Sequence, residues 1–325
     1  MRKEAAAYPT PTYKDRHDRR MVSIIRRSNA PMNESVNILG IPFDGATLGR
    51  KGSSEAPRAI REALRFNSNF NPEIGISLAR ARIYDLGDLV LNEQDVKDVH
   101  RAIGKEVRRC IRPSSLLILI GGDNSISLPA ITALSKCGNL GLIVVDSHYD
   151  MRGEIAGKPT SGSSYYLALK RHGERLKGRV AYIGQHGFLN SLFYANRAEK
   201  LGVKVFTASD VLKEGALAIA RSAYSIASEG ADCVYLSVDI DCVGLAEVSG
   251  VSAPSPSGLS SAQLFSICTY LASREKVKVV DVVETSPSLD QTGRSQIVAA
   301  TTLCYLAAGF ELRKLMKLPL RKLRG

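Results

Sequence analysis

The sequence predicts an α/β protein: a single three-layer α/β/α domain built on a central parallel sheet of about eight strands. Short apolar runs rich in Val, Ile and Leu recur along the chain, and longer stretches of helical character separate most of them. Continuous apolar runs are typical of parallel strands that are buried on both faces. Strands that alternate with helices predict right-handed crossovers within one sheet.

The elements follow one another without a long linker or an internal repeat, so we expect one domain. Residues 1–34 are interpreted as an extended N-terminal arm, with a short helix around Asp18–Arg26, and residues 35–325 as the domain. Each predicted strand is an apolar run, at residues 36–40, 82–86, 115–120, 141–146, 179–184, 203–207, 232–238 and 277–284. The predicted helices cover residues 56–65, 94–109, 127–134, 191–200, 216–227, 261–273 and 296–316.

Composition and charge exclude several classes of protein. The chain has 325 residues, 44% of them hydrophobic, which is enough for a large buried core. No apolar stretch reaches the ~18 residues of a membrane span and no secretory leader is evident, so we predict a cytoplasmic protein with no membrane partner. The net charge of +12 is diffuse and densest near both ends. Without an aromatic-studded basic motif, it predicts no nucleic-acid partner and favours an anionic substrate.

Two clusters of metal-binding residue types follow two of the predicted strands. Asp146, His148 and Asp150 occupy every second position after one strand, and Asp239 and Asp241 follow another. Residues two apart in extended backbone point to the same side, so each cluster can converge on one point. Because grouped carboxylates repel one another without a cation, the clusters predict a pair of divalent metal ions.

Two more predicted strands end in polar residues. Gly121-Gly122-Asp123-Asn124 follows the strand at 115–120, and Glu284 closes the strand at 277–284. In parallel sheets of this class, ligands bind beyond the carboxyl ends of the strands. Four strand ends are therefore predicted to bring polar groups to one rim of the sheet.

In this arrangement the chain resembles the ureohydrolase superfamily of arginase, agmatinase and formimidoylglutamase, over about residues 36–310. Asp146–Asp150 resembles the family's D-A-H-x-D motif, and Ser237–Asp241 resembles S-x-D-x-D. Asp281–Glu284 resembles D-x-x-E near the C-terminus. The stretch at 121–124 resembles GGxH, with Asn124 in place of the histidine. The resemblance implies the arginase-like fold.

Three further segments resemble formimidoylglutamases in particular. Gly250–Pro254 reads G-V-S-A-P, which is common in that branch. Thr160–Ser163 resembles their S-S-G-T stretch, where arginases and agmatinases usually place a His-Gly. Asp290–Ser295 resembles their D-x-D-x-R-T, with Thr292 and Ser295 as departures.

The resemblance implies a hydrolase that acts on C–N bonds in linear amidines, with two Mn²⁺ ions per subunit. A hydroxide that bridges the ions would attack the amidine carbon. By the same resemblance, Asp146 and Asp239 would each bind both ions, and His148 and Asp241 would complete the second site. Asp150 would bind the first ion.

The expected substrate is N-formimidoyl-L-glutamate, which is cleaved to L-glutamate and formamide in histidine degradation. Asp150 and Glu284 are the expected catalytic residues, and Glu284 would also bind the cationic formimidoyl nitrogens. Arg50 and Arg152 are candidates for pairing with a substrate carboxylate, because guanidinium groups match carboxylates in geometry. A surface role for each arginine stays open.

Asn124 departs from the family pattern and leaves two interpretations open. As a metal ligand it offers a carbonyl oxygen, which is a poorer donor to Mn²⁺ than imidazole, so the first site would fill weakly. As a loop residue it would only form hydrogen bonds. Agmatinase or another guanidino hydrolase that releases urea is an alternative function, and a catalytically degenerate homologue that binds a ligand is another. The resemblance also implies a homo-oligomer, a trimer or a hexamer.

Overall fold

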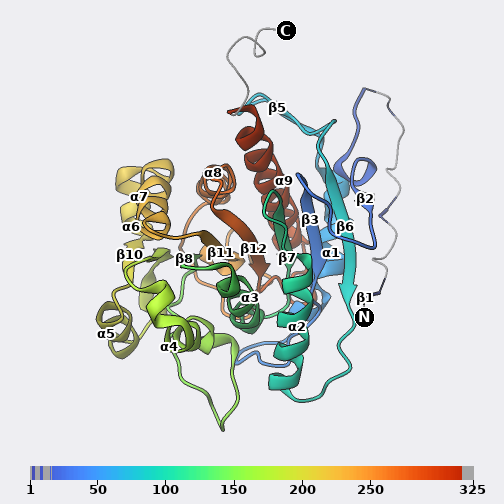
Figure 1. Cartoon of the computed structure of the whole chain (residues 1–325). Helices are drawn as coiled ribbons and strands as arrows, with labels where there is room; N and C mark the ends of the chain where they lie inside the picture. The colour runs from blue at the N-terminus through green and yellow to red at the C-terminus, as the bar shows by residue number, and fades with distance from the viewer. Residues whose placement is uncertain (1, 4–7, 10–14, 16, 317–325) are drawn as a thin grey trace.

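The computed structural model describes residues 2–3, 8–9, 15 and 17–316, and all structural statements below concern these residues. A central sheet lies between two layers of helices (Figure 1). The strand order is β1-β6-β3-β7-β12-β11-β8-β9-β10, and β2 also pairs with β6. The eight longer strands are mutually parallel: β3 (Val36–Gly40), β6 (Ile83–Leu89), β7 (Leu116–Ile120), β8 (Leu140–Val145), β9 (Val180–Gln185), β10 (Lys204–Thr207), β11 (Cys233–Asp239) and β12 (Val277–Val283). The two-residue strand β2 also runs parallel to β6, which makes nine parallel strands.

These eight strands confirm the predicted sheet and its α/β class. Two short strands, β1 (Arg2–Lys3) and β2 (Arg26–Arg27), extend the sheet at the β6 edge, and β1 runs antiparallel to β6. A separate hairpin joins β4 (Phe70–Asn71) to β5 (Ile76–Ser77).

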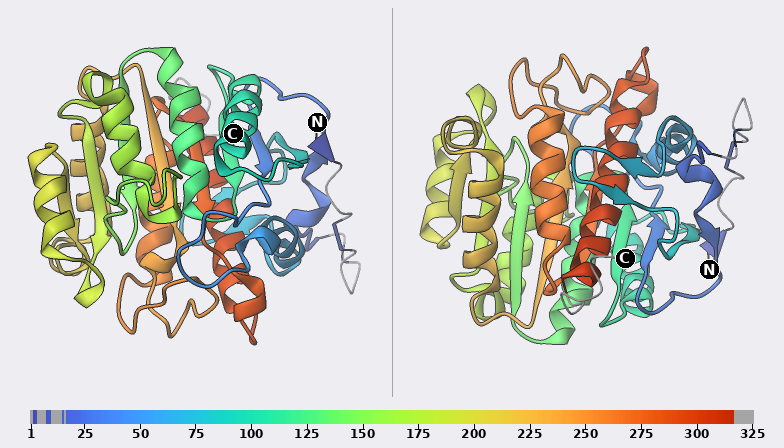
Figure 2. Two further views of the ribbon diagram at one scale, coloured as in Figure 1. Left: turned by 90° about the horizontal axis from the view of Figure 1, so that it is seen from below. Right: turned by 90° about the horizontal axis from the view of Figure 1, so that it is seen from above.

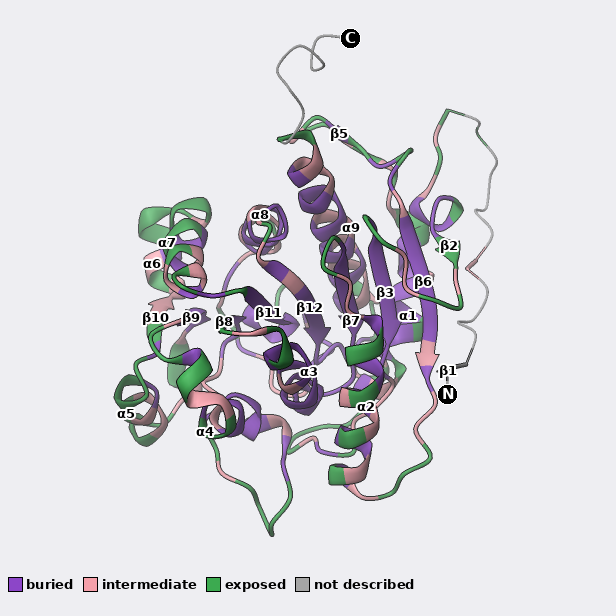
Figure 3. Ribbon diagram, viewed as in Figure 1, coloured by how far each residue is buried: buried purple, intermediate pink, exposed green. Residues whose placement is uncertain are grey.

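The helices divide into two groups, one on each face of the sheet, as the two views of Figure 2 show. One buried apolar cluster joins the sheet to α1 (Ala56–Ala63), α6 (Ala208–Glu214), α7 (Ala216–Ser228), α8 (Ser261–Ala272) and α9 (Arg294–Leu315). The other joins the opposite face to α2 (Val96–Cys110), α3 (Ser127–Leu134), α4 (Ser164–Leu176) and α5 (Leu192–Lys200). Because helices cover both faces, the central strands are buried, as Figure 3 shows for β3. The strand β6 is buried except at Asp88. This double burial explains their continuous apolar sequence.

Three features of the helices differ from the prediction. The helix around Asp18–Arg26 is only a three-residue 3-10 helix, Met21–Ser23, because Met21, Val22, Ile24 and Ile25 turn into the core. The helices α4 and α6 were not predicted. A kink at His172 interrupts the helical geometry of α4, and α6 has only seven residues.

The helix α9 is the one described helix that is long and apolar enough, by length and composition, to cross a membrane. Its most apolar window is 56% buried inside the protein, and the helix packs against α8 and α1. We interpret α9 as a core helix of the domain.

The sheet order positions the polar strand ends. The strands β7, β12, β11 and β8 are consecutive neighbours in the sheet. In their parallel register, Val238 lies opposite Val145 and Val282, so Asp239 follows at the level of Asp146. Val282 lies opposite Ile120, which places Gly121 and Val283 at the same level. The predicted meeting of four strand ends at one rim is therefore confirmed.

Candidate metal centre

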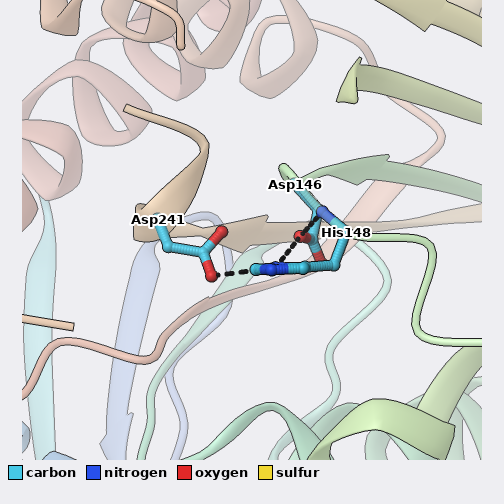
Figure 4. A group of neighbouring side chains, drawn as sticks. All are labelled: Asp146, His148 and Asp241. Atoms are coloured by element: carbon cyan, nitrogen blue, oxygen red, sulfur yellow. Dashed lines mark hydrogen bonds and ion pairs between the residues drawn. The ribbon is translucent and has the colours of Figure 1, made fainter. Parts of the chain in front are cut away.

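Three side chains from two neighbouring strand ends form a compact cluster of metal-ligand types. Asp146, His148 and Asp241 offer ligand atoms that all lie within 4.8 Å of one another. His148 Nδ1 lies 3.1 Å from Asp241 Oδ2 and 3.5 Å from Asp146 Oδ1, so the imidazole sits between the two carboxylates (Figure 4). The cluster has the nitrogen and oxygen donors that suit Mn²⁺.

Turns, rather than extended backbone, bring the alternate residues together. Asp146 Oδ1 accepts a hydrogen bond from the His148 backbone N–H at 2.5 Å, and Asp239 Oδ1 accepts one from the Asp241 N–H at 3.0 Å. An aspartate that bonds the backbone two residues ahead closes a tight turn. Each motif thus folds back on its first aspartate, and the hydroxyl of Ser147 donates to Asp241 Oδ1 at 2.7 Å, which links the two motifs.

Asp150 and Asn124 meet on the adjacent side of the rim. The Asn124 amide Nδ2 donates a short hydrogen bond to Asp150 Oδ2. Its Oδ1 accepts from the hydroxyls of Ser127 at 2.9 Å and Tyr165 at 3.0 Å. Asp150 has a positive φ of 46°, a conformation that costs energy in a non-glycine residue. This strained backbone aims the carboxylate back toward the strand ends.

Glu284 has the same kind of backbone strain, with a φ of 66°. Its Oε1 accepts a hydrogen bond from the Asn124 backbone N–H at 2.8 Å, and its own N–H donates to the carbonyl of Gly122 at 2.9 Å. These bonds join the end of β12 to the loop after β7. Gly122 is required there because a Cβ would lie 1.7 Å from the Phe43 carbonyl oxygen.

Burial and mutual repulsion perturb the carboxylates of the centre. Burial raises the pKa of Asp146 to about 6, and the charge of Asp241 adds to the shift. Burial and the neighbouring aspartates raise the pKa values of Asp150 and Asp239 well above the usual range. Burial and Asp123 do the same to the pKa of Glu284. A group of carboxyls that resists ionisation in this way calls for a bound cation.

The pKa values of His148 and Asp241 shift so that both groups favour their charged forms. Burial lowers the pKa of His148, but the carboxylates of Asp241 and Asp146 outweigh it and raise the pKa to about 12. Burial raises the pKa of Asp241, and the facing imidazolium outweighs that effect and lowers it. A metal ion would replace the imidazolium proton, because only the neutral ring can bind a metal.

Unpartnered oxygen atoms show that the site suits a cation. Asp146 Oδ2 and Glu284 Oε2 are buried and have no hydrogen-bond partner in the described part of the chain. Buried carboxylate oxygens ordinarily have a partner, and an ion is one way to supply it. The residues present therefore fit a metal group with oxygen and imidazole ligands.

The two candidate arginines lie outside the cluster. Arg50 is exposed, and its guanidinium donates to the carbonyls of Val251 at 2.7 Å and Ser252 at 3.3 Å. Arg152 is also exposed and stacks on the ring of Tyr194 at 5.1 Å from the centroid. Arg152 follows Asp150 by two residues, so its backbone lies close to the centre.

Polar residues behind the centre form hydrogen bonds with one another and with Asn124, and the sequence analysis gave them no role. Asp281, within the D-x-x-E motif, accepts hydrogen bonds from the hydroxyls of Ser127, Tyr235 and Ser237. The hydroxyl of Tyr165, on the unpredicted helix α4, lies 3.0 Å from both Asn124 Oδ1 and Ser237 Oγ and can donate its one proton to either. Only the polar character of these residues within apolar runs could have signalled such a role.

Comparisons with known proteins agree with this geometry. The arginase family matches residues 34–309. A formimidoylglutamase of Halobacterium salinarum is 32% identical over 308 residues, which cover 92% of this chain and 97% of the relative. The solved formimidoylglutamase of Bacillus subtilis has a TM-score of 0.86 at 27% identity, with 93% and 94% of the two chains covered.

A formiminoglutamase of Trypanosoma cruzi has been solved with Mn²⁺, at a TM-score of 0.82 and 25% identity, with 91% of this chain and 99% of that chain covered. An asparagine-to-histidine variant of the same enzyme has also been solved with Mn²⁺. The family match spans most of the chain, and the predicted arginase-like fold is confirmed. This chain belongs to the arginase family.

Proposed function

We propose that this protein hydrolyses N-formimidoyl-L-glutamate to L-glutamate and formamide. The observation that carries the proposal is the convergence of Asp146, His148 and Asp241 within 4.8 Å at the carboxyl ends of neighbouring strands. Three of the relatives and structures most similar to this chain are enzymes named for this reaction.

Two Mn²⁺ ions are the metal group that we assign to the centre. Six residues would hold them: Asp146, His148, Asp150, Asp239, Asp241 and, through its amide oxygen, Asn124. When bound, two such ions supply Lewis-acid chemistry and lower the pKa of a water molecule toward neutrality.

Glu284 is the residue that we assign to the reacting end of the substrate. Its Oε2 is buried and unpartnered among the described residues, so it can accept a hydrogen bond from a formimidoyl nitrogen. A cationic amidine beside it would stabilise the ionised carboxylate, whose pKa burial otherwise raises. In the metal-free structure the Asp150 carboxylate accepts a hydrogen bond from the Asn124 amide. We assign Asp150 to orienting the attacking water as well as to metal binding.

Arg152 and Arg50 are proposed to receive the carboxylates of the glutamate portion. The Arg152 guanidinium is exposed, and its weak contact with the Tyr194 hydroxyl at 3.4 Å leaves donors for a ligand. Arg50 already donates to two backbone carbonyls, so it would contact a carboxylate with its remaining donors.

The reaction products test the proposal. The purified protein, supplied with Mn²⁺, is offered N-formimidoyl-L-glutamate and, separately, agmatine, and formamide, glutamate and urea are measured. We expect formamide and glutamate in equal amounts, and no product from the Asp241→Asn variant. Urea as the sole product would instead establish the guanidino hydrolase.

We further propose that the protein works in the cytoplasm as a homo-oligomer, a trimer or a hexamer. Light scattering on the Mn²⁺-loaded protein measures the number of subunits. A monomeric mass at micromolar concentration would contradict the oligomer.

A further inference from the structure

A cavity with a strongly basic lining lies apart from the metal centre, between the outer sides of α2 and α3. Its volume is about 780 Å³, and no aspartate or glutamate lines it. Seven lysines and arginines do, five of which have no ion pair or side-chain hydrogen bond in the described part of the chain: Lys97, Lys105, Arg108, Lys136 and Arg171. The other two pair with their own helix, Arg101 with Asp98 and Arg109 with Glu106.

The cations come from three separate elements. Lys97, Lys105 and Arg108 belong to α2, Lys136 follows α3, and Arg171 belongs to α4. Figure 1 shows α2, α3 and α4 together on one face of the sheet. All five residues are exposed. Like charges that line one cavity from separate elements repel one another, so the arrangement favours an anion that several of them can bind at once.

The buried residues of the cavity's lining include no lysine or arginine, and several of them are apolar. Pro129, Ala133 and Pro159 are buried residues of its lining. Gly104 allows α2 and α3 to approach closely, since a Cβ there would lie 3.3 Å from the Pro129 carbonyl oxygen. A volume of about 780 Å³ exceeds what an inorganic ion fills and falls within the range of small-molecule sites.

We propose that this cavity binds a small phosphorylated metabolite. Its phosphate dianion would pair with the lysines and arginines, which match phosphate oxygens in charge and geometry, and its organic portion would lie against the proline and alanine surface. The concave shape suits a small molecule. None of the five unpaired cations belongs to the metal centre or to its proposed substrate contacts.

The cavity nevertheless reaches the loop that carries Asn124. His100 is buried in the lining, and its Nε2 lies 3.0 Å from the hydroxyl of Ser125, the residue after Asn124. A ligand in the cavity would thus lie one side chain away from the loop at the end of β7.

Calorimetric titration of the full-length, Mn²⁺-loaded protein tests the proposal, with adenosine monophosphate and ribose 5-phosphate as probes. The cavity variant is Lys105→Gln/Arg108→Gln. The matched control is Arg80→Gln/Lys200→Gln, which removes the same two charge types from exposed positions outside the lining. We expect one ligand per chain, a Kd about tenfold higher in the cavity variant, and a Kd within about twofold of the wild type in the control.

The two probes identify the source of the phosphate. Equal binding of both assigns a sugar phosphate, and binding of adenosine monophosphate alone assigns a nucleotide; both outcomes support the site. Three outcomes would overturn it: no binding at millimolar probe, equal weakening in the cavity and control variants, or loss of binding in Asp241→Asn, which would place the ligand at the metal centre.

Discussion

At the scale of single residues, Asn124 is the proposed metal ligand for which two interpretations are open. Its Oδ1 and Nδ2 are exchanged by a half-turn of the amide, and the structure points Nδ2 at Asp150. The hydroxyls of Ser127 and Tyr165 can accept hydrogen bonds as well as donate them. The half-turn would keep the contacts with Ser127 and Tyr165, give up the hydrogen bond to Asp150 and offer the oxygen to a cation, so both interpretations of Asn124 are compatible with its surroundings.

Replacing Asn124 by histidine tests its part in metal binding. We expect the wild-type protein to retain fewer than two Mn²⁺ ions per chain after dialysis, and Asn124→His to retain close to two, because imidazole is the better donor. Metal content is measured by mass spectrometry. Asn139→His, which adds an imidazole at an exposed site, should match the wild type. Two ions retained at full occupancy by the wild type would contradict the expectation.

The same variant separates adaptation from degeneration. A wild type that is active on N-formimidoyl-L-glutamate shows that the asparagine is part of a working site. An inactive wild type that gains activity on Asn124→His would support a degenerate homologue.

At the scale of elements, the sequence was sufficient for the sheet but not for every helix. The eight longer parallel strands were all predicted, because most of them are buried on both faces and form apolar runs. The edge strand β10 is only partly buried. The helix α4 gave a weaker signal, since it contains Gly173 and a kink at His172. The seven residues of α6 are too few for a clear helical period, although its capping box at Thr207 and Asp210 is a local signature that could have revealed it.

The residues of the candidate site also fall into two groups: those that the sequence identifies and those that only the fold brings together. Asp146 and Asp239 were identifiable because each is a charged residue at the end of an apolar strand. The hydrogen bonds of Asp281 with Ser127 and Ser237 were not predictable, because they join positions 154 and 44 residues apart and depend on the strand order.

A buried ion pair between α1 and β6 supports a prediction at the scale of elements. The Arg61 guanidinium donates to Asp85 at 2.7 Å and to Asp88 at 2.6 Å, and its side chain is 3% exposed. Arg61→Met would leave the Asp85 carboxylate buried without its partner, so we expect the free energy of unfolding to fall by about 3–5 kcal/mol. Urea denaturation measures it.

Arg58, on the same helix, provides the control. It pairs with Glu62 at 2.9 Å, and the two side chains are 58% and 45% exposed. Exposed pairs of this kind contribute little, so Arg58→Met should change the unfolding free energy by less than about 1 kcal/mol. A similar loss in both variants would show that burial of the Arg61 pair has no special effect.

At the scale of the whole molecule, the fold concentrates carboxyl groups at one rim and depends on a cation to neutralise them. Burial raises the pKa of Asp146 from an ordinary 3.8 to about 6, and the pKa values of Asp150, Asp239 and Glu284 also rise. Between pH 3.8 and 6 the metal-free folded protein keeps a proton on Asp146 that the unfolded chain has lost. Stability therefore falls as the pH rises through this window.

His148 makes the stability of the metal-free protein fall further at higher pH. Its pKa of about 12 in the metal-free protein lies far above the ordinary 6.5, because Asp241 and Asp146 outweigh the effect of burial. The stability that its proton confers is fully present below pH 6.5 and is lost as the pH rises toward 12. Mn²⁺ binding has the opposite dependence, because it requires the deprotonated ligands.

The thermal stability of the protein with and without Mn²⁺ should therefore diverge as the pH rises. We expect the Tm of the metal-free protein to fall between pH 5 and pH 8, and the increase in Tm on adding Mn²⁺ to be larger at pH 8. For Asp146 alone, the shift in pKa corresponds to on the order of 3 kcal/mol. Asp146→Asn removes this titration and should reduce both effects in scanning calorimetry. A larger stabilisation by Mn²⁺ at pH 5 than at pH 8 would mean that the ion does not bind these carboxylates and this imidazole, since protons would then not compete with it.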